Sequence, residues 1–280
     1  MNLIKTRHFD GVEMIQLGYG PVGPPLMAVF LYVVDGLVID TAQHHMARAV
    51  ERLLREKPLD RILLTHHHED HSGNAAMISN WHALPVMGHP LTAEKLNSGF
   101  PIRPHQRWVW GKAPAVTVTP LEGPIETDHF RLESVHTPGH SKDHTVFFEK
   151  QRGWLFSGDL YLAERIKFFR ADEDFGDQIA SLKKVLALDF DALFCGHNPS
   201  VENGKQKLRS KLQFLEDLYG RIRSFLREGL SEKAIIRKLD VRRDRLVKWL
   251  TLGNMSFANM IKSAIDSASR SDSTSHHRMQ

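Results

Sequence analysis

The chain has 280 residues, of which 41% are hydrophobic and 25% charged, and it carries a formal net charge of +4. This composition is ordinary for a globular protein with one large domain or a domain plus an appendage. The N-terminal stretch does not fit a secretory signal, and the most apolar run, "LMAVFLYVV", is too short to span a bilayer. Cys195 is the single cysteine, which excludes an intrachain disulfide. We therefore expect a cytoplasmic protein with no membrane partner.

Residues 1–200 predict strands that alternate with helices. Residues 26–40 contain two β-rich runs joined at Asp35-Gly36, which is a hairpin signal, and a helix is expected over residues 45–57. Later short apolar segments predict strands within residues 60–65, 85–90, 129–140, 144–150, 153–159 and 192–197, with a helix over 177–188. This alternation indicates layered α and β structure.

The stretch "THHHEDHSGN", residues 65–74, holds four of the 17 histidines and directly follows an apolar strand. His66, His68, Asp70 and His71 give the pattern H-x-H-x-D-H. Side chains two residues apart on an extended loop point the same way, so His66 and His68 can bind one ion. Asp70 and His71 can bind a second ion once the chain has turned. The alternative interpretation is a polar loop exposed to solvent.

Three later segments have the same form, an apolar strand that runs into a turn with a ligand-type residue. They are "SVHTPGHS" with His140, "WLFSGDL" with Asp159 and "ALFCGHN" with His197. Imidazole and carboxylate groups suit zinc, iron or manganese. Four such turns in order indicate a metal site at strand ends, where a rigid backbone holds the geometry.

From Lys205 onward the pattern becomes purely helical. Apolar residues from Leu208 to Leu226 recur at three- and four-residue intervals, which predicts a long amphipathic helix. Shorter helices are expected over residues 231–239, with Ser231 as N-cap, and over 242–250 and 256–265. A helix-turn-helix or winged-helix unit is disfavoured because no wing hairpin follows.

Charge is distributed unevenly along the chain. Residues 205–270 contain 16 Lys and Arg against 7 Asp and Glu, or +9, whereas residues 1–204 carry −5. A basic segment either binds a polyanion such as nucleic acid or forms the solvated face of helices, and we favour the second interpretation.

Residues 10–204 resemble the metallo-β-lactamase superfamily in the segments "LVIDTA", "THHHEDHSGN", "HTPGHS", "LFSGDL" and "FCGHNPS". The resemblance implies an α/β fold, an αββα sandwich with two mixed sheets face to face, helices outside and the metal site at one edge. It divides the chain into a catalytic domain (1–204), a C-terminal helical cap or appendage (205–268) and a flexible tail (269–280).

The resemblance also implies two divalent metal ions, zinc first, with iron or manganese as alternatives. The implied ligands are His66, His68 and His140 for the first ion, Asp70, His71 and His197 for the second, and Asp159 as a bridge. Asp40 and Thr65 are expected to support these ligands, with Asp40 accepting a hydrogen bond from a ligand imidazole. His67 and Glu69 are expected either to support the ligands or to face solvent.

The implied chemistry is hydrolysis by a hydroxide shared between the two ions, because metal binding lowers the pKa of water to about 7. Asp70 would orient the hydroxide as well as bind metal. Tyr161 and His144 are candidates for giving the leaving group a proton, and either can instead be a packing residue. Cys195 lies in an apolar strand and is expected to be inert.

Three branches of the family compete. The segments "THHHEDHSGN", "FCGHNPSVEN" and "IKFF" resemble those of glyoxalase II, a thioesterase. The last of them would place Lys167 and Phe169 by the substrate. Lactamase-beta-like hydrolases, some of which cleave single-stranded RNA, are resembled in "HTPGHSKDH" and in the helical extension. Quorum-type thioesterases and lactonases would use the helices as an apolar cap, with the candidate residues Phe225, Trp249, Phe257 and Met260.

We expect a small-molecule acyl substrate: a thioester, an ester or a lactone. Residues 1–204 carry a net negative charge, which repels polyanions, and they lack interleaved aromatic and basic residues on which bases could stack. Both features disfavour nucleic acid as the substrate. A phosphodiesterase or endoribonuclease is the alternative, and a non-catalytic binding protein is a weaker one because all seven ligands are present. The protein is expected to be a monomer or a homodimer.

Overall fold

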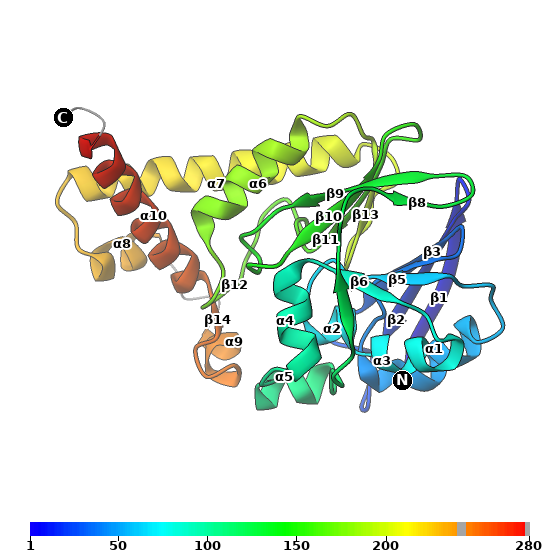
Figure 1. The fold of residues 1–280 in the computed structure, drawn as a ribbon. Helices are drawn as coiled ribbons and strands as arrows, with labels where there is room; N and C mark the ends of the chain where they lie inside the picture. The colour runs from blue at the N-terminus through cyan, green and yellow to red at the C-terminus, as the bar shows by residue number, and fades with distance from the viewer. Residues whose placement is uncertain (240–244, 278–280) are drawn as a thin grey trace. The chain divides into compact units, whose positions relative to one another are not determined.

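The computed structural model describes residues 1–239 and 245–277 (Figure 1). The chain forms two compact units. The first contains residues 1–136, 142–162 and 188–205, and the second contains residues 137–141, 163–187 and 206–280. None of the described helices is long and apolar enough to cross a membrane.

The larger sheet of the first unit has seven strands in sequential order. β1 to β4 are antiparallel neighbours, and β4 to β7 run parallel. The strands are β1 (Leu3–Phe9), β2 (Val12–Gly18), β3 (Val29–Val34), β4 (Leu37–Ile39), β5 (Arg61–Leu63), β6 (Val86–Gly88) and β7 (Val118–Pro120).

Two tight hairpins begin this sheet. The β3–β4 hairpin turns at Asp35-Gly36, with φ of 46° and 77°, as the sequence predicted. The β1–β2 hairpin was not predicted, although Asp10-Gly11 has the same form and φ of 46° and 87°. Positive φ at both central residues is the requirement of a type I′ turn, which Asp-Gly meets well.

The smaller sheet of the first unit has five strands in the order β13-β11-β10-β9-β8, and only the β13–β11 pair is parallel. Its strands are β8 (Ile125–Glu126), β9 (Arg131–His136), β10 (Thr145–Glu149), β11 (Trp154–Gly158) and β13 (Ala192–Cys195). The two sheets share one apolar core, in which Tyr32 and Leu63 of the larger sheet join Phe156 and Phe194 of the smaller one.

Helices cover the other face of the larger sheet. Alternate residues of β3, Val29 and Leu31, pack with Val50 and Ile78 in a second apolar core. Strand side chains alternate between faces, so a strand with apolar residues on both faces is buried on both. The helices of this unit are the 3₁₀ helix η1 (His44–Met46), α1 (Ala47–Leu54), α2 (Glu69–Ser72), α3 (Ala75–His82), α4 (Pro90–Ser98) and α5 (Pro104–Val109).

The second unit is mostly helical. Its elements are β12 (Phe169–Arg170), α6 (Phe175–Leu186), α7 (Gly204–Arg227), whose first two residues belong to the first unit, α8 (Glu232–Lys238), α9 (Arg245–Leu250), β14 (Met255–Ser256) and α10 (Phe257–His277). β12 pairs with β14. The long helix was predicted, and α8 begins after Ser231 as expected. Residues 269–277, expected in a flexible tail, instead continue α10, while residues 242–244 and 278–280 lie outside the described residues.

Several side chains that were expected to form an apolar cap have other surroundings in the second unit. Met260 is buried in the core of the unit, whereas Trp249 is 73% exposed. Phe225 lies under the ammonium group of Lys238, with Nζ 4.6 Å from the ring centroid. Phe169 is fully buried, 6.4 Å from the ring of Phe175, so the substrate contact that the resemblance implied for it is wrong.

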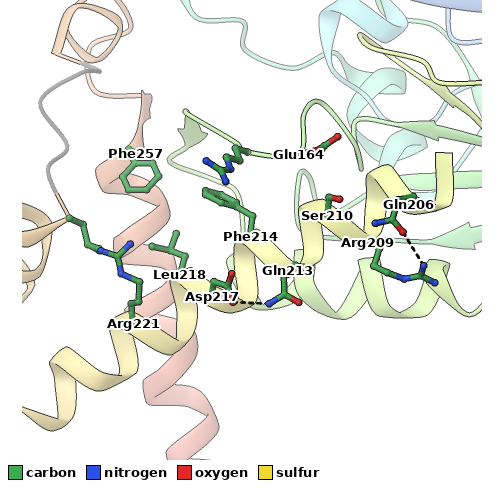
Figure 2. A pocket seen from close by; sticks show the side chains of 12 residues that line it. Glu164, Gln206, Arg209, Ser210, Gln213, Phe214, Asp217, Leu218, Arg221 and Phe257 are labelled. Carbon is green, nitrogen blue, oxygen red and sulfur yellow. Dashed lines mark hydrogen bonds between the residues drawn. The ribbon is translucent and has the colours of Figure 1, made fainter. Parts of the chain in front are cut away.

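A groove of about 650 Å³ runs along one face of α7. Figure 2 shows Phe214 and Leu218 on this face of the helix, between Gln206 and Arg221. The full lining is Glu164, Arg165, Gln206, Arg209, Ser210, Gln213, Phe214, Asp217, Leu218, Arg221, Leu239 and Phe257. In this lining Asp217 lies between Arg209 and Arg221 along α7, and Glu164 lies beside Arg165, so the groove itself is not an unbroken positive track.

Candidate metal centre

Six of the seven predicted ligands lie in the first unit, at strand ends or in the short helix α2. His66 and His68 follow β5, Asp70 and His71 lie in α2, Asp159 follows β11 and His197 follows β13. Ligand atoms of His66, His71 and Asp159 lie within 4.8 Å of one another, and so do those of Asp70, His71 and His197. Segments far apart in the sequence therefore bring these side chains together.

Two imidazoles and two carboxylates converge within this cluster. Nε2 of His71 lies 3.3 Å from Oδ1 of Asp159 and 3.8 Å from Oδ2 of Asp70. Nε2 of His197 lies 3.3 Å from Oδ2 of Asp70 and 3.5 Å from Oδ2 of Asp159. All four side chains are at least nine-tenths buried. Each ring therefore directs Nε2 at both carboxylates.

The opposite nitrogen of each ring is fixed by the protein. Nδ1 of His71 lies 2.7 Å from Oδ2 of Asp40, and Nδ1 of His197 lies 2.8 Å from the carbonyl oxygen of Ala28. Because an ionised carboxylate and a carbonyl only accept hydrogen bonds, Nδ1 carries the hydrogen in both rings. When either ring is neutral, its Nε2 carries a lone pair and no hydrogen, and that lone pair faces the negative oxygens of Asp70 and Asp159. This arrangement is repulsive unless a cation or a proton lies between them, so the donor set fits a divalent metal ion.

The pKa values of these groups reflect the same electrostatics. Burial lowers the pKa of His197, but the Asp159 and Asp70 carboxylates outweigh it and raise that pKa to about 10. Burial also opposes the charged form of His71, yet Asp159, Asp40 and Asp70 raise its pKa well above the ordinary value. Conversely, burial would raise the pKa of Asp159, but the charges of His197 and His71 hold it well below its usual range. The site thus stabilises positive charge between ionised carboxylates.

Asp40 supports ligands of both proposed ions. It follows β4 with φ of 57°, a conformation that aspartate tolerates better than most residues. Its carboxylate accepts the hydrogen of His71 Nδ1 and also accepts hydrogen bonds from the N–H (2.8 Å) and hydroxyl (2.8 Å) of Thr65. Because that hydroxyl donates to Asp40, it accepts from Nδ1 of His66 at 3.0 Å. The hydrogen bond that Asp40 was expected to accept from an imidazole is present, with His71 as its donor.

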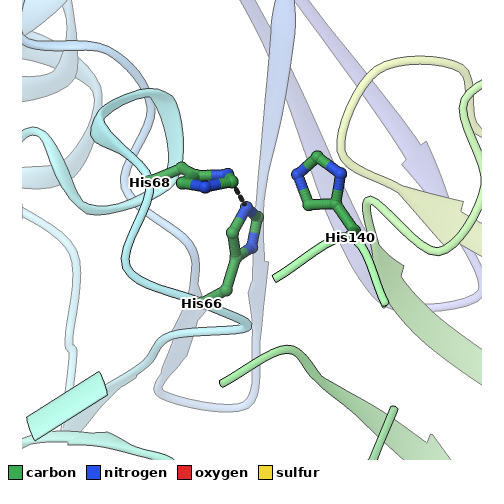
Figure 3. A group of neighbouring side chains, drawn as sticks. All are labelled: His66, His68 and His140. Atoms are coloured by element: carbon green, nitrogen blue, oxygen red, sulfur yellow. Dashed lines mark hydrogen bonds between the residues drawn. The ribbon is translucent and has the colours of Figure 1, made fainter. Parts of the chain in front are cut away.

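His66 and His68 present their rings to each other. Nε2 of His66 lies 2.9 Å from Nδ1 of His68. Figure 3 marks this hydrogen bond with a dashed line. Since Nδ1 of His66 bonds to Thr65, Nε2 of His66 is an acceptor directed at the neighbouring ring. These two nitrogens can bind the same ion when His68 is neutral with its hydrogen on Nε2, because Nδ1 then carries a lone pair.

His140, the third residue in Figure 3, belongs to the second unit. It is buried, and its Nδ1 lies 3.5 Å from Oε1 of Glu173 in the same unit. A carboxylate beside Nδ1 favours a hydrogen on that nitrogen and leaves the lone pair of a neutral ring on Nε2.

A glycine at the end of β11 allows the chain to approach His144 closely. Gly158 has φ of 46°, and a Cβ there would lie 2.8 Å from both Nε2 of His144 and Oγ1 of Thr65. The next residue, Asp159, donates its backbone N–H to Nε2 of His144 at 3.0 Å. Because Nε2 accepts this bond, the geometry favours a role for His144 in positioning Asp159 over the proton-donating role considered from the sequence.

Tyr161 and Cys195 lie close together behind the site. Both are buried, and the Cys195 thiol donates to the backbone carbonyl of Tyr161. Burial fits the inert role expected for Cys195. The proton-donating role of Tyr161 stays a prediction.

The sequence analysis gave no role to Asp143, which holds the backbone between two of the candidate ligands. Its carboxylate accepts the backbone N–H of His67 at 2.9 Å and the hydroxyl of Thr92 at 2.8 Å, and it also bonds to Nδ1 of His67. It thereby fixes the backbone between His66 and His68. His67 and Glu69 are both buried, which excludes the solvent-facing alternative for them.

Comparison with known proteins identifies relatives of this chain. A family model described as the metallo-beta-lactamase superfamily matches residues 26–197. A curated relative from Legionella pneumophila (strain Lens), named hydroxyacylglutathione hydrolase, is 32% identical over 150 residues, which cover 52% of this chain and 51% of the relative. The chain thus spans about half the length of that relative.

Two solved structures support the fold. A metallo-beta-lactamase family protein from Thermus thermophilus has a TM-score of 0.65 with 22% identity, covering 93% of this chain and 95% of its own. A protein solved in a di-iron-bound form has a TM-score of 0.53 with 27% identity, covering 67% of this chain and 96% of its own. The predicted fold class is confirmed: an α/β fold with mixed sheets, helices and a C-terminal helical region.

We expect the metal-loaded protein to contain two divalent ions per chain, and Asp159→Ala to lose at least one of them together with about 100-fold or more of any metal-dependent turnover. Asp159 follows a strand at its end, so its removal opens no apolar cavity and the far-UV circular dichroism should not change. Elemental analysis after gel filtration measures the ions, with the exposed Glu56→Ala as control. Full metal content and unchanged turnover in Asp159→Ala would contradict the bridging role.

Metal binding should release protons. At pH 7 the His197 imidazole, with a pKa of about 10, is protonated when no ion is bound, and an ion must displace that proton. Apparent affinity should therefore rise about tenfold or more per pH unit between pH 6 and 9. Calorimetric zinc titrations in buffers of different ionisation enthalpy count the protons. Affinity that is independent of pH, with no proton released, would contradict a His197 imidazole that is protonated in the metal-free site and loses its proton to the ion.

Asp40→Asn should weaken metal binding by about 10- to 100-fold, because an amide cannot accept from His71 and Thr65 as an ionised carboxylate does. Asparagine tolerates positive φ, so the backbone at this position is preserved. Competition with a chromophoric chelator measures the affinity. Asp35→Asn, in the β3–β4 turn, is the matched control, and equal affinities of the two variants would exclude a supporting role for Asp40.

Proposed function

Because this chain belongs to the metallo-beta-lactamase superfamily, we propose that it is a dinuclear-metal hydrolase that acts on an acyl substrate: a thioester, an ester or a lactone. The observation that carries the proposal is the pair of imidazoles, His71 and His197, whose Nδ1 atoms are fixed and whose Nε2 atoms face the carboxylates of Asp70 and Asp159. A buried arrangement of this kind is costly for the fold and useful for binding cations.

The first ion is assigned to His66, His68 and His140, the second to Asp70, His71 and His197, and Asp159 to both. His140 is included because the chain re-enters the first unit at Lys142, so connectivity alone keeps its Cα within about 7 Å of that residue. Zinc is the proposed metal, and the di-iron form of one structural neighbour supports iron as the alternative. Such ions supply an activated water and stabilise negative charge on the substrate.

The protein's own groups hold this site in place. Asp70 presents one carboxylate oxygen to His197 and lies beside His71, so it can accept a proton from the attacking water while it binds metal. His144 fixes the backbone of Asp159, and Asp40 fixes the rings of His71 and, through Thr65, His66. No serine or cysteine nucleophile is required, because the nucleophile is water.

Two observations support an acyl substrate over a nucleic acid. Residues 1–204, which hold all seven ligands, carry −5. The groove along α7 mixes Arg165, Arg209 and Arg221 with Glu164 and Asp217 and lacks an unbroken basic surface. The name of the relative from Legionella pneumophila, a hydrolase of hydroxyacylglutathione, points the same way.

A panel of thioesters, esters, lactones, bis(p-nitrophenyl) phosphate and single-stranded RNA tests the proposal on the zinc-loaded chain. We expect acyl compounds to be hydrolysed, with rates that change less than about twofold between 50 and 200 mM salt. Hydrolysis of a polyanion would weaken by orders of magnitude over that range as counterion release is lost. Salt-sensitive cleavage of RNA with every acyl compound intact would establish the phosphodiesterase, and no turnover at all with two ions bound would indicate a binding protein.

A further inference from the structure

Large apolar side chains are exposed together at one place in the first unit. The loop between β2 and β3, residues 19–28, exposes Val22 (92%), Leu26 (71%) and Met27. Trp108, in α5, is 64% exposed. Side chains of this size are seldom left in water as a group, and a contiguous exposed apolar surface marks a binding site.

Trp108 lines two adjoining cavities, and Val22 and Leu26 line the smaller of them. The larger, about 430 Å³, is lined by Tyr19, Pro21, His45, Pro104, Arg107 and Trp108. The smaller, about 140 Å³, is lined by Tyr19, Pro21, Val22, Pro24, Leu26, Trp108 and Val109. Because Tyr19, Pro21 and Trp108 belong to both, we treat the two as one feature, the Trp108 cleft. Its described lining contains no carboxylate, and its surface is mainly aromatic and proline side chains.

Both walls of the Trp108 cleft lead along the chain to residues that contact His197. The loop ends at Ala28, whose carbonyl oxygen accepts the hydrogen of His197 Nδ1 at 2.8 Å. Helix α5 is followed by Trp110, whose ring centroid lies 6.1 Å from that of His197. The walls are also joined to each other, since Tyr19 stacks on His45 at 4.3 Å and the His45 N–H donates to the Trp110 carbonyl at 3.3 Å.

We propose that the Trp108 cleft binds the apolar part of the acyl group, so that the natural substrate is an ester, thioester or lactone of a medium-chain, long-chain or aromatic acid. This inference rests on the proposed hydrolase function and adds the substrate class to it. The walls of the cleft lead to Ala28 and Trp110, which contact His197, so the cleft lies beside a candidate ligand of the metal centre. A mainly apolar lining without carboxylates suits an aliphatic or aromatic acyl group better than a cationic or a strongly polar one.

A series of p-nitrophenyl esters from acetate to decanoate, used below their micelle concentrations on the metal-loaded full chain, tests the inference. We expect kcat/KM to rise by about two- to fourfold per methylene until the cleft is filled. The gain should appear mainly as a lower KM, since the chain is bound equally in the ground state and in the transition state.

Trp108→Ala and Val22→Ser should each flatten this series, with the decanoate-to-acetate ratio of kcat/KM at least about tenfold lower in Trp108→Ala. Both side chains are exposed, so neither substitution opens a core cavity. Ile4→Ala removes an exposed apolar side chain from β1, outside the cleft, and should keep the wild-type ratio.

Persistent turnover with equal kcat/KM along the series, or a series that neither cleft variant changes, would overturn the inference and leave the hydrolase function standing. A flat series together with a wild-type dimer that Trp108→Ala dissociates would assign the surface to a second copy of the chain. Failure to hydrolyse any ester, thioester or lactone with two ions bound would contradict the hydrolase function itself.

Discussion

The structure depends on one electrostatic constraint, the convergence of buried imidazole nitrogens and carboxylate oxygens that only positive charge can hold together. The fold fixes Nδ1 of His71 on Asp40 and Nδ1 of His197 on Ala28, and both Nε2 atoms then face Asp70 and Asp159. Neutral rings and ionised carboxylates would repel one another at these distances. A divalent ion turns the same geometry into strong attraction, which accounts for so many costly groups being buried at one sheet edge.

Much of the supporting structure serves to keep these groups at fixed distances. Asp40 reaches ligands of both proposed ions with one carboxylate, because its left-handed backbone turns the chain back towards Thr65 at the end of β4. Gly158 has no side chain to separate the end of β11 from His144, so the N–H of Asp159 can donate directly to Nε2 of His144. A metal site whose ligands are held by a second set of hydrogen bonds binds its ions with less loss of conformational entropy.

The sequence placed the candidate ligands at the ends of apolar strands or in the turns and short helix that follow them, and the ends of β5, β11 and β13, from both sheets, converge in the fold. Their role as metal ligands stays a prediction. The sequence also predicted the β3–β4 hairpin, since Asp35-Gly36 meets a backbone requirement that few other pairs meet. It missed the supporting role of Asp143 and the Trp108 cleft, because these depend on contacts between segments that periodicity does not reveal. The Phe169 expectation failed since a short motif does not show burial, which tertiary packing decides.

The most direct test of this account is a crystal structure of the zinc-loaded protein with anomalous differences measured on both sides of the zinc edge. The account predicts two strong peaks about 3.5–4 Å apart, with Asp159 as a ligand of both, one near His66 and His68 and the other near Asp70, His71 and His197. A single peak, or peaks on surface histidines with none beside Asp159, would contradict it.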